Sequence, residues 1–136
     1  MNVLVDTSVW ALALRRRAAA PSQEVEELRT LVHAGRVTML GAIRQELLSG
    51  IRATESFERL RDTLRAFPDE PLAAADYEEA AEYFNACRVR GVQGSNTDFL
   101  ICAVATRRQL PILTADADFL RFARVLPIVL HQQPRR

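Results

Sequence analysis

Short apolar runs alternate along this chain with amphipathic segments, a pattern typical of strands joined by helices. Runs buried on both faces predict strands at residues 2–5, 37–40, 111–114 and 125–130, with a further short strand near residues 68–71. Apolar positions at helical spacing predict helices at residues 7–17, 22–34, 42–49, 54–67, 73–90, 96–107 and 116–122. This alternation favours an α/β fold, in which a mainly parallel sheet of four to five strands is covered by helices on both faces.

Two segments carry more specific information about the sheet. Residues 96–107 are apolar nearly all round (FLICAVA), so this helix should pack deep against the sheet. Pro127 lies within the last predicted strand and favours an edge position, because proline cannot donate a ladder hydrogen bond. The chain has no internal repeat and no interior linker. We therefore expect a single domain over residues 1–136, with residues 131–136 as a mobile tail.

The composition is that of an ordinary soluble globular protein. Of 136 residues, 49% are apolar and 26% are charged. No apolar run approaches the roughly 20 residues that span a bilayer, and the first residues (MNVLVDTS) lack the basic start of a secretory signal. Cys87 and Cys102 are too few for a disulfide framework and are expected to be reduced core residues. These observations predict a cytoplasmic protein with no membrane association.

Arginine supplies every basic side chain, because the 18 basic residues include no lysine. Walker-type phosphate loops, haloacid-dehalogenase phosphatases and receiver domains all rely on a lysine near the phosphoryl group, so these classes fit poorly. The arginines gather at residues 15–17, 107–108 and 135–136, with Arg121 and Arg124 close to the second cluster. Each cluster would serve either as a phosphate contact or as a solvated face. The net charge of +1 does not decide between them.

Acidic residues follow the predicted strands at the places where an open α/β sheet binds ligands. Asp6 ends the first strand, Asp116 and Asp118 follow the fourth, Asp98 lies in the first turn of the helix before it, and Glu46 lies on the helix after the second strand. Each has a simple alternative explanation, such as a helix cap, a favourable charge at a helix start or a solvated helix position. Independent caps would have no reason to converge on one rim of the sheet. Asp6, Glu46, Asp98 and Asp116 are therefore the candidate metal-binding and catalytic residues.

The chemistry of this set favours a hard divalent cation. Carboxylates without histidine form an oxygen-only cluster, which suits Mg²⁺ or Mn²⁺ rather than zinc, and His33 and His131 are each isolated in the sequence. Such an ion stabilises the charge that builds on a phosphodiester, so hydrolysis of a nucleic-acid backbone is the matching reaction. Asp118, Thr7, Ser8 and Asn96 are accessory candidates. They would orient a carboxylate, a water or a phosphate, or simply cap their helices.

Four ordered motifs carry a family resemblance that spans residues 2 to about 130. VLVDTSVW, IRQELLSG, GSNTDFLICAVA and LPILTADADFL resemble those of PIN-domain ribonucleases, and most of all the VapC-type toxins of toxin–antitoxin pairs. The resemblance implies a three-layer α/β/α sandwich and an endoribonuclease dependent on Mg²⁺ or Mn²⁺. Asp6, Glu46, Asp98 and Asp116 would be its acids, with Asp118 accessory. It also implies a homodimer, an RNA substrate and a cognate antitoxin, which can insert an arginine into the acidic pocket.

Two other functions are consistent with the sequence. The first is a catalytically inert PIN-like binding module, whose acidic pocket receives an arginine from a partner. The second is a phosphate enzyme that acts on DNA flaps or small phosphoesters, although this short chain lacks the extra segments of larger flap nucleases. A metal titration of RNA cleavage separates the ribonuclease from the binding module.

Overall fold

Three parallel strands form the centre of the molecule. The computed structural model describes residues 1–15 and 22–132, and contains β1 (Val3–Val5), β2 (Val37–Thr38) and β3 (Ile112–Leu113) in the order β2-β1-β3. Val3 pairs with Val37 on one side of β1, and Val5 pairs with Leu113 on the other. All three strands run in the same direction, so the residues that follow β1 and β3 lie at the same edge of the sheet.

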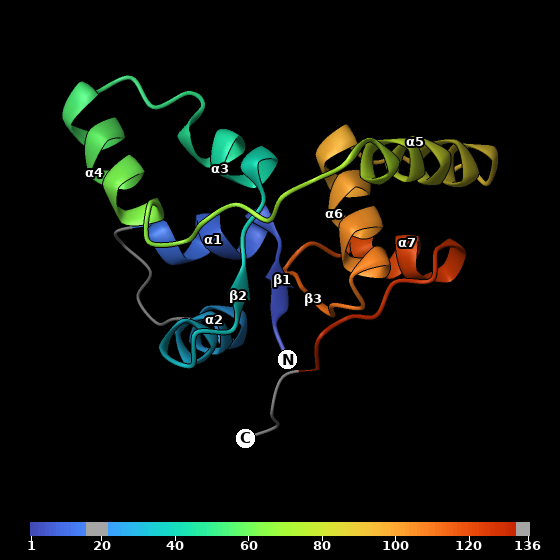
Figure 1. Ribbon diagram of the computed structural model, residues 1–136, viewed down its shortest axis with the longest axis horizontal. Helices are drawn as coiled ribbons and strands as arrows, with labels where there is room; N and C mark the ends of the chain where they lie inside the picture. The colour runs from blue at the N-terminus through green and yellow to red at the C-terminus, as the bar shows by residue number, and fades with distance from the viewer. Residues whose placement is uncertain (16–21, 133–136) are drawn as a thin grey trace.

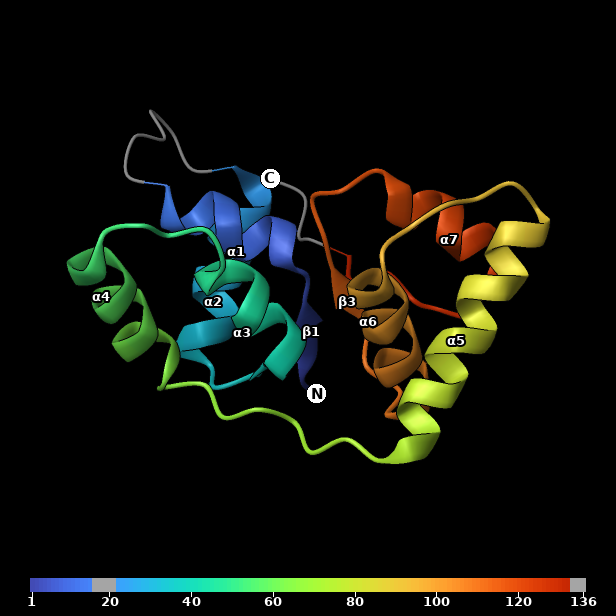
Figure 2. The same ribbon diagram turned by 90° about the horizontal axis from the view of Figure 1, so that it is seen from above.

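Helices cover both faces of this sheet, as Figures 1 and 2 show. The first group, α1 to α4, lies on one side of β1, and the second group, α5 to α7, lies on the other. Their bounds are α1 (Thr7–Leu14), α2 (Gln23–His33), α3 (Gly41–Leu48), α4 (Thr54–Leu64), α5 (Ala74–Val89), α6 (Asn96–Arg107) and α7 (Asp118–Val125). The predicted three-layer α/β/α arrangement is confirmed.

The sheet has fewer regular strands than the four or five predicted. Three are regular in the described residues, and its outer edges are single parallel bridges, Met39 to Asp69 and Ile112 to Leu130. The strand predicted at residues 125–130 is wrong in its first part, because α7 continues to Val125 and buries Phe119 and Phe122. The end of that segment does lie at the sheet edge, as the proline indicated.

Several predicted ends also shift. The helix predicted at residues 7–17 ends at Leu14, and residues 16 and 17 lie outside the described residues. Within the predicted tail, residues 133–136 lie outside the described residues. His131 is held against the fold, because its amide donates to the Ile112 carbonyl at 2.7 Å and its ring lies 3.6 Å from Glu27.

The core is continuous from β1 through α6. Phe99, Leu100 and all five residues from Ile101 to Ala105 are buried, so the prediction that this helix packs deep is confirmed. Cys87 and Cys102 are buried free thiols within the core. Phe99 contacts both Phe84 of α5 and Phe122 of α7, with ring centroids 5.5 and 5.0 Å apart. These aromatic contacts join the three helices of the second group.

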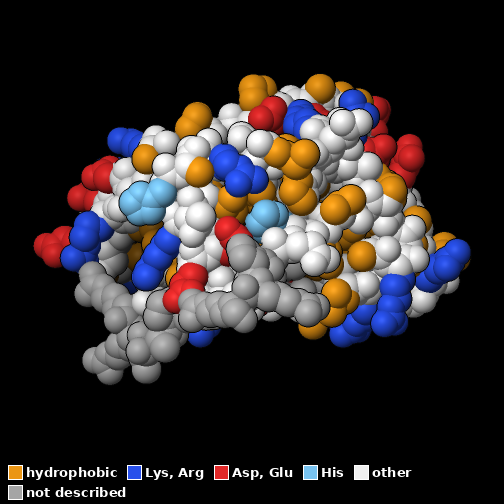
Figure 3. All heavy atoms as spheres, turned by 90° about the horizontal axis from the view of Figure 1, so that it is seen from below, with side chains coloured by type: hydrophobic (Ala, Val, Ile, Leu, Met, Phe, Trp, Pro, Cys, Tyr) orange, Lys and Arg blue, Asp and Glu red, His pale blue; other side chains and the backbone are white. Residues whose placement is uncertain are grey.

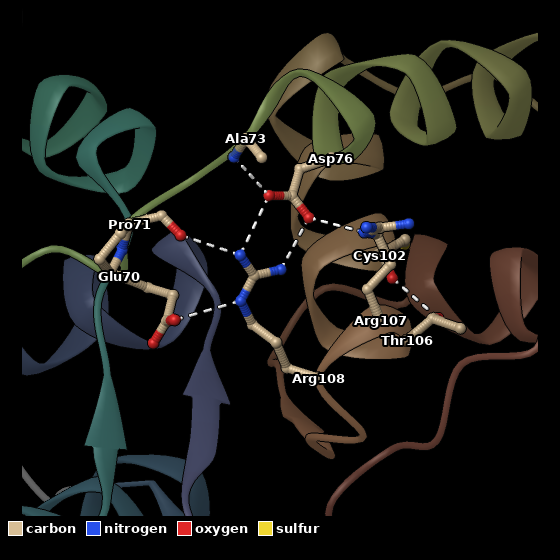
Figure 4. Close-up of polar contacts among 8 residues, drawn as sticks. All are labelled: Glu70, Pro71, Ala73, Asp76, Cys102, Thr106, Arg107 and Arg108. Carbon is tan, nitrogen blue, oxygen red and sulfur yellow. Dashed lines mark hydrogen bonds and ion pairs between the residues drawn. The ribbon is translucent and has the colours of Figure 1, made fainter.

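A buried carboxylate ties the C-terminus of α6 to the start of α5 (Figure 4). Asp76 is 1% exposed and accepts hydrogen bonds from Arg107 Nε (2.8 Å), Arg108 Nη1 (2.7 Å) and Nη2 (3.0 Å), and the Ala73 amide (2.8 Å). Arg108 also donates to Glu70 and to the Pro71 carbonyl. These bonds lower the pKa of Asp76 well below its ordinary value, with Arg108 as the main cause. The arginine pair 107–108 therefore holds the fold together.

The face opposite the strand ends is partly apolar. Figure 3 shows hydrophobic side chains spread over this underside. Met1 and Val129 are among the exposed hydrophobic residues. None of the helices in the part of the chain that the structure describes has the length and apolar character of a membrane span.

Candidate functional site

Asp6 lies where β1 ends and α1 begins. It occupies the N-cap position of α1, where its side chain forms no capping hydrogen bond of standard geometry. Its Oδ2 instead accepts hydrogen bonds from Ser8 Oγ at 2.7 Å and from Thr114 Oγ1 at 2.9 Å. The side chain is 3% exposed, and burial raises its pKa although these hydroxyls act in the opposite direction. The carboxylate is therefore held in place but poorly solvated.

The loop after β3 joins this carboxylate to Asp116. Ser8 Oγ accepts from the Ala115 amide and Thr114 Oγ1 accepts from the Asp116 amide, each at 3.0 Å. The ends of two neighbouring strands are thus cross-linked through hydroxyl groups. Thr114 was missed by the sequence analysis, although its position two residues before Asp116, at a strand end, was a usable signal.

Asp116 and Asp118 have different surroundings. Asp116 Oδ1 accepts from the Asp118 amide at 2.9 Å, just before α7, whose N-cap is Ala117. Asp118 is the first residue of α7 and pairs with Arg121 at 3.1 Å on an exposed surface. Arg121 is therefore engaged by Asp118.

Asp98 reaches the same region from the first turn of α6. It forms a capping box with Ser95: the Ser95 amide donates to Asp98 Oδ2 at 3.0 Å, and the Asp98 amide donates to Ser95 Oγ at 3.1 Å. Burial raises the pKa of Asp98, and the negative charges of Asp6 and Asp116 raise it further. Asp98 therefore lies within electrostatic reach of both Asp6 and Asp116. Ser95 was also missed, although the Ser-x-x-Asp spacing is the signature of a capping box.

Asn96 does not have the capping role considered for it, because Ser95 is the N-cap of α6. Asn96 is the exposed first residue of this helix. No hydrogen bond to its side chain occurs among residues 1–15 and 22–132.

Glu46 approaches from the other group of helices. Its Oε1 accepts a hydrogen bond from Thr7 Oγ1 at 2.7 Å, which connects α3 to the residue next to Asp6. Arg44, two residues earlier, anchors α3 through bonds to Asp69 and to the carbonyls of Leu64 and Phe67. Glu46 is exposed, so its carboxylate lies at the rim of the site.

The donor set suits a hydrated divalent cation. In the described residues, no three His, Cys, Asp or Glu side chains are arranged to hold a metal ion as they stand. Burial is the main cause of the raised pKa of Asp98, and the negative charges of Asp6 and Asp116 add to it, so a cation at this place would be favourable. Mg²⁺ keeps several of its waters and needs only one or two direct carboxylates. The oxygen donors are therefore of the kind that such an ion prefers, although the described side chains do not form a closed cage around it.

Comparison with known proteins finds one family model and relatives that match most of this chain. The model of the PIN domain family matches residues 3–125. VapC ribonuclease Mb1587 of Mycobacterium bovis and ribonuclease VapC11 of Mycobacterium tuberculosis are each 32% identical over 125 residues, covering 90% of this chain and 92% of the relative.

Two solved structures share the fold. FitAcB from Neisseria gonorrhoeae has a TM-score of 0.72 at 19% identity, covering 95% of this chain and 96% of the other. VapBC2 from Rickettsia felis, bound to a DNA fragment from their promoter, has a TM-score of 0.73 at 18% identity, covering 96% and 98%.

Proposed function

This chain belongs to the PIN-domain family and is a relative of its VapC ribonucleases, and from that premise we propose that it is a metal-dependent endoribonuclease, the toxin of a toxin–antitoxin pair. The observation that carries the proposal is the convergence of Asp6, Asp98 and Asp116 at one edge of the sheet. Hydroxyl groups link the first to the third, and electrostatic repulsion couples both to the second. The match over residues 3–125 and the continuous core support a single domain over residues 1–136.

In this proposal Asp6, Asp98 and Asp116 hold Mg²⁺ or Mn²⁺, and Glu46 completes the site at its rim. The ion would supply a Lewis acid that stabilises charge on the phosphodiester. The protein's own groups prepare the carboxylates: Ser8 and Thr114 fix the orientation of Asp6.

Two further contacts prepare the remaining acids. Ser95 holds Asp98 through the two reciprocal hydrogen bonds of the capping box. Thr7 positions Glu46 beside the site through a hydrogen bond between their side chains. The free Oε2 of Glu46 would orient the attacking water and accept its proton. Asp118 would act indirectly, because its backbone amide donates to Asp116 Oδ1 and so helps to orient that carboxylate.

Partners follow from the same family relationship. We propose an RNA substrate, a cognate antitoxin, a homodimer and a cytoplasmic location. Structural similarity to VapBC2 supports the antitoxin. Size-exclusion chromatography with light scattering would measure the homodimer. Co-expression with the product of a small neighbouring reading frame would test the antitoxin, which should co-purify and inhibit cleavage.

Cleavage of total RNA by purified wild type, Asp6→Asn and Asp98→Asn tests the function directly. Both substitutions should abolish Mg²⁺- or Mn²⁺-dependent cleavage without unfolding the protein, because each removes a carboxylate charge but keeps the side-chain shape. Asp62→Asn is the matched control, since Asp62 is exposed on α4. Full activity in both site variants would refute the assignment. A wild type without any metal-dependent product would favour the binding module, and sequencing of RNA ends would identify the target.

A further inference from the structure

A cavity of about 300 Å³ lies beside the candidate active site, between the C-terminal half of α5, the loop after it and the first turn of α6. This volume is at the lower end of small-ligand pockets, which begin near 300 Å³. Its lining combines aromatic, cationic and amide groups: Phe84, Arg88, Val92, Gln93, Gly94 and Phe99.

The polar groups of this cavity are available to a ligand. Arg88 and Gln93 are exposed, and neither side chain has a hydrogen bond or ion pair within the described ranges 1–15 and 22–132. In contrast, Arg108 and Arg121 are engaged by carboxylates of the protein. The half-buried Phe84 adds aromatic surface. An aromatic ring, a guanidinium and a carboxamide are the groups with which proteins bind unpaired RNA bases and their phosphates.

The loop that forms one wall has a fixed shape. Gly94 packs so closely that an added Cβ would lie 2.6 Å from Phe122 Cζ and 3.1 Å from Phe99 Cε2. The Val92 amide donates to the Cys87 carbonyl at 2.9 Å, and the capping box of Ser95 closes the other end of the loop. The cavity is therefore largely formed before a ligand arrives, which lowers the entropic cost of binding.

The cavity and the acidic site share the first turn of α6. Asp98 interacts with Asp6 and Asp116, whereas the next residue, Phe99, packs between Phe84 and Phe122. Successive helix residues project about 100° apart, so the cavity and the carboxylates lie on adjoining sides of one helix end. A single nucleic-acid strand that crosses the N-terminal end of α6 would contact both the cavity and the carboxylates.

We propose, on the premise of the ribonuclease function above, that this cavity binds an unpaired nucleotide of the RNA next to the cleaved phosphodiester. Phe84 supplies the aromatic surface for the base, Gln93 hydrogen-bonds its edge, and Arg88 contacts a flanking phosphate. A base in a duplex has its Watson–Crick edge occupied, so the cavity selects single-stranded segments. Arg88 and Gln93 are then determinants of substrate binding and base preference.

The test compares Arg88→Ala and Gln93→Ala with the matched control Arg90→Ala. Arg90 is also exposed and lies two residues from Arg88, but it does not line the cavity. Three quantities are measured on folded proteins: kcat/KM for a single-stranded oligonucleotide, base preference in a randomised pool, and oligonucleotide binding in EDTA by fluorescence anisotropy.

Arg88→Ala should lower both affinity and kcat/KM by about tenfold, the size of one charge-assisted contact. Gln93→Ala should weaken base preference at one position beside the cut, and Arg90→Ala should stay within about twofold of wild type. Equal losses in Arg88→Ala and Arg90→Ala, or an unchanged base preference in Gln93→Ala, would overturn the proposal. A smaller particle in gel filtration for Arg88→Ala would also overturn it, in favour of a protein interface.

These outcomes are separable from failure of the ribonuclease assignment. Metal-dependent cleavage by wild type together with equal losses in the two arginine variants rejects only the nucleotide cavity. Absence of cleavage by wild type rejects the ribonuclease, and the anisotropy comparison then still decides whether the cavity binds RNA.

Discussion

Replacement of Asp76 by Asn should be among the most destabilising conservative changes in this protein. The carboxylate is 1% exposed and accepts four hydrogen bonds of 2.7 to 3.0 Å, three of them from Arg107 and Arg108. Removal of one partner from a buried ion pair costs about 3–5 kcal/mol. Arg108 keeps its bonds to Glu70 and to the Pro71 carbonyl and is partly solvated, so the lower end of that range, about 3 kcal/mol, is expected.

Urea unfolding measures this loss. Trp10 is the only tryptophan, is 4% exposed and packs edge-on against Phe67 with ring centroids 5.1 Å apart, so its fluorescence reports on the core. Asp62→Asn is the control, because Asp62 is 62% exposed and pairs with Arg61 on the surface. Such exposed pairs contribute about 0–1 kcal/mol. If Asp76→Asn loses no more stability than Asp62→Asn, the network of Figure 4 does not stabilise the fold as argued.

The pH dependence gives an independent check of the same reasoning. The pKa of Asp76 is lowered in the folded protein, so the unfolded chain binds its proton more readily. The stabilising contribution is therefore complete above the ordinary aspartate pKa of about 3.9 and decreases as the pH falls toward the lowered value. The stability difference between wild type and Asp76→Asn should be constant near pH 7 and shrink at acidic pH. A constant difference down to pH 2 would contradict this cause.

Two further changes test the site and the loop beside it. Asp98→Asn should raise the melting temperature of the metal-free protein at pH 7. Burial and repulsion raise the pKa of Asp98 and so destabilise its ionised form, which the substitution removes. The difference in melting temperature should disappear as the pH falls below about 4, where the carboxyl group is protonated in the folded and the unfolded protein. Mg²⁺ or Mn²⁺ should raise the melting temperature of wild type more than that of Asp98→Asn, and equal shifts would argue against a metal role. Gly94→Ala should cost about 1–3 kcal/mol in urea unfolding, because its Cβ would overlap Phe122; unchanged stability would mean that the loop moves freely.

The sequence predicted the elements whose burial pattern is unambiguous. The apolar run before Asp6 and the all-round apolar helix after Asp98 each have one plausible place in an α/β fold, and both lie there. The strand predicted at residues 125–130 was wrong in its first part because Phe119, Phe122 and Val125 continue a helical spacing, and α7 buries the two phenylalanines. The local sequence pattern did not show whether the helical period of about 3.6 residues or the strand period of two residues would hold over this segment.

Contacts between residues distant in sequence explain the other differences between the sequence predictions and the structure. Arg107 and Arg108 looked like candidates for phosphate contacts, because their partner Asp76 precedes them by more than thirty residues and reaches them only once α5 packs on α6. Strand direction alone predicted that Asp6 and the loop that holds Asp116 follow neighbouring parallel strands at the same edge of the sheet, whereas the role of the aspartates as one site stays a prediction. The sequence did carry a signal for Thr114, at a strand end, and for Ser95, in a Ser-x-x-Asp spacing, but the hydrogen bonds that each residue makes depend on side-chain geometry.

The extended segment between α4 and α5 connects two parts of the chain that each contribute half of the candidate acids (Figure 2). Asp6 and Glu46 precede it, whereas Asp98 and Asp116 follow it. A cut in this segment would therefore yield two fragments that each lack half of the proposed catalytic acids, and RNA cleavage would return only when the two fragments associate. RNA cleavage on mixing the separately expressed fragments would measure this reassembly. The arrangement of the acids would then allow a toxin that acts only where both fragments are expressed together.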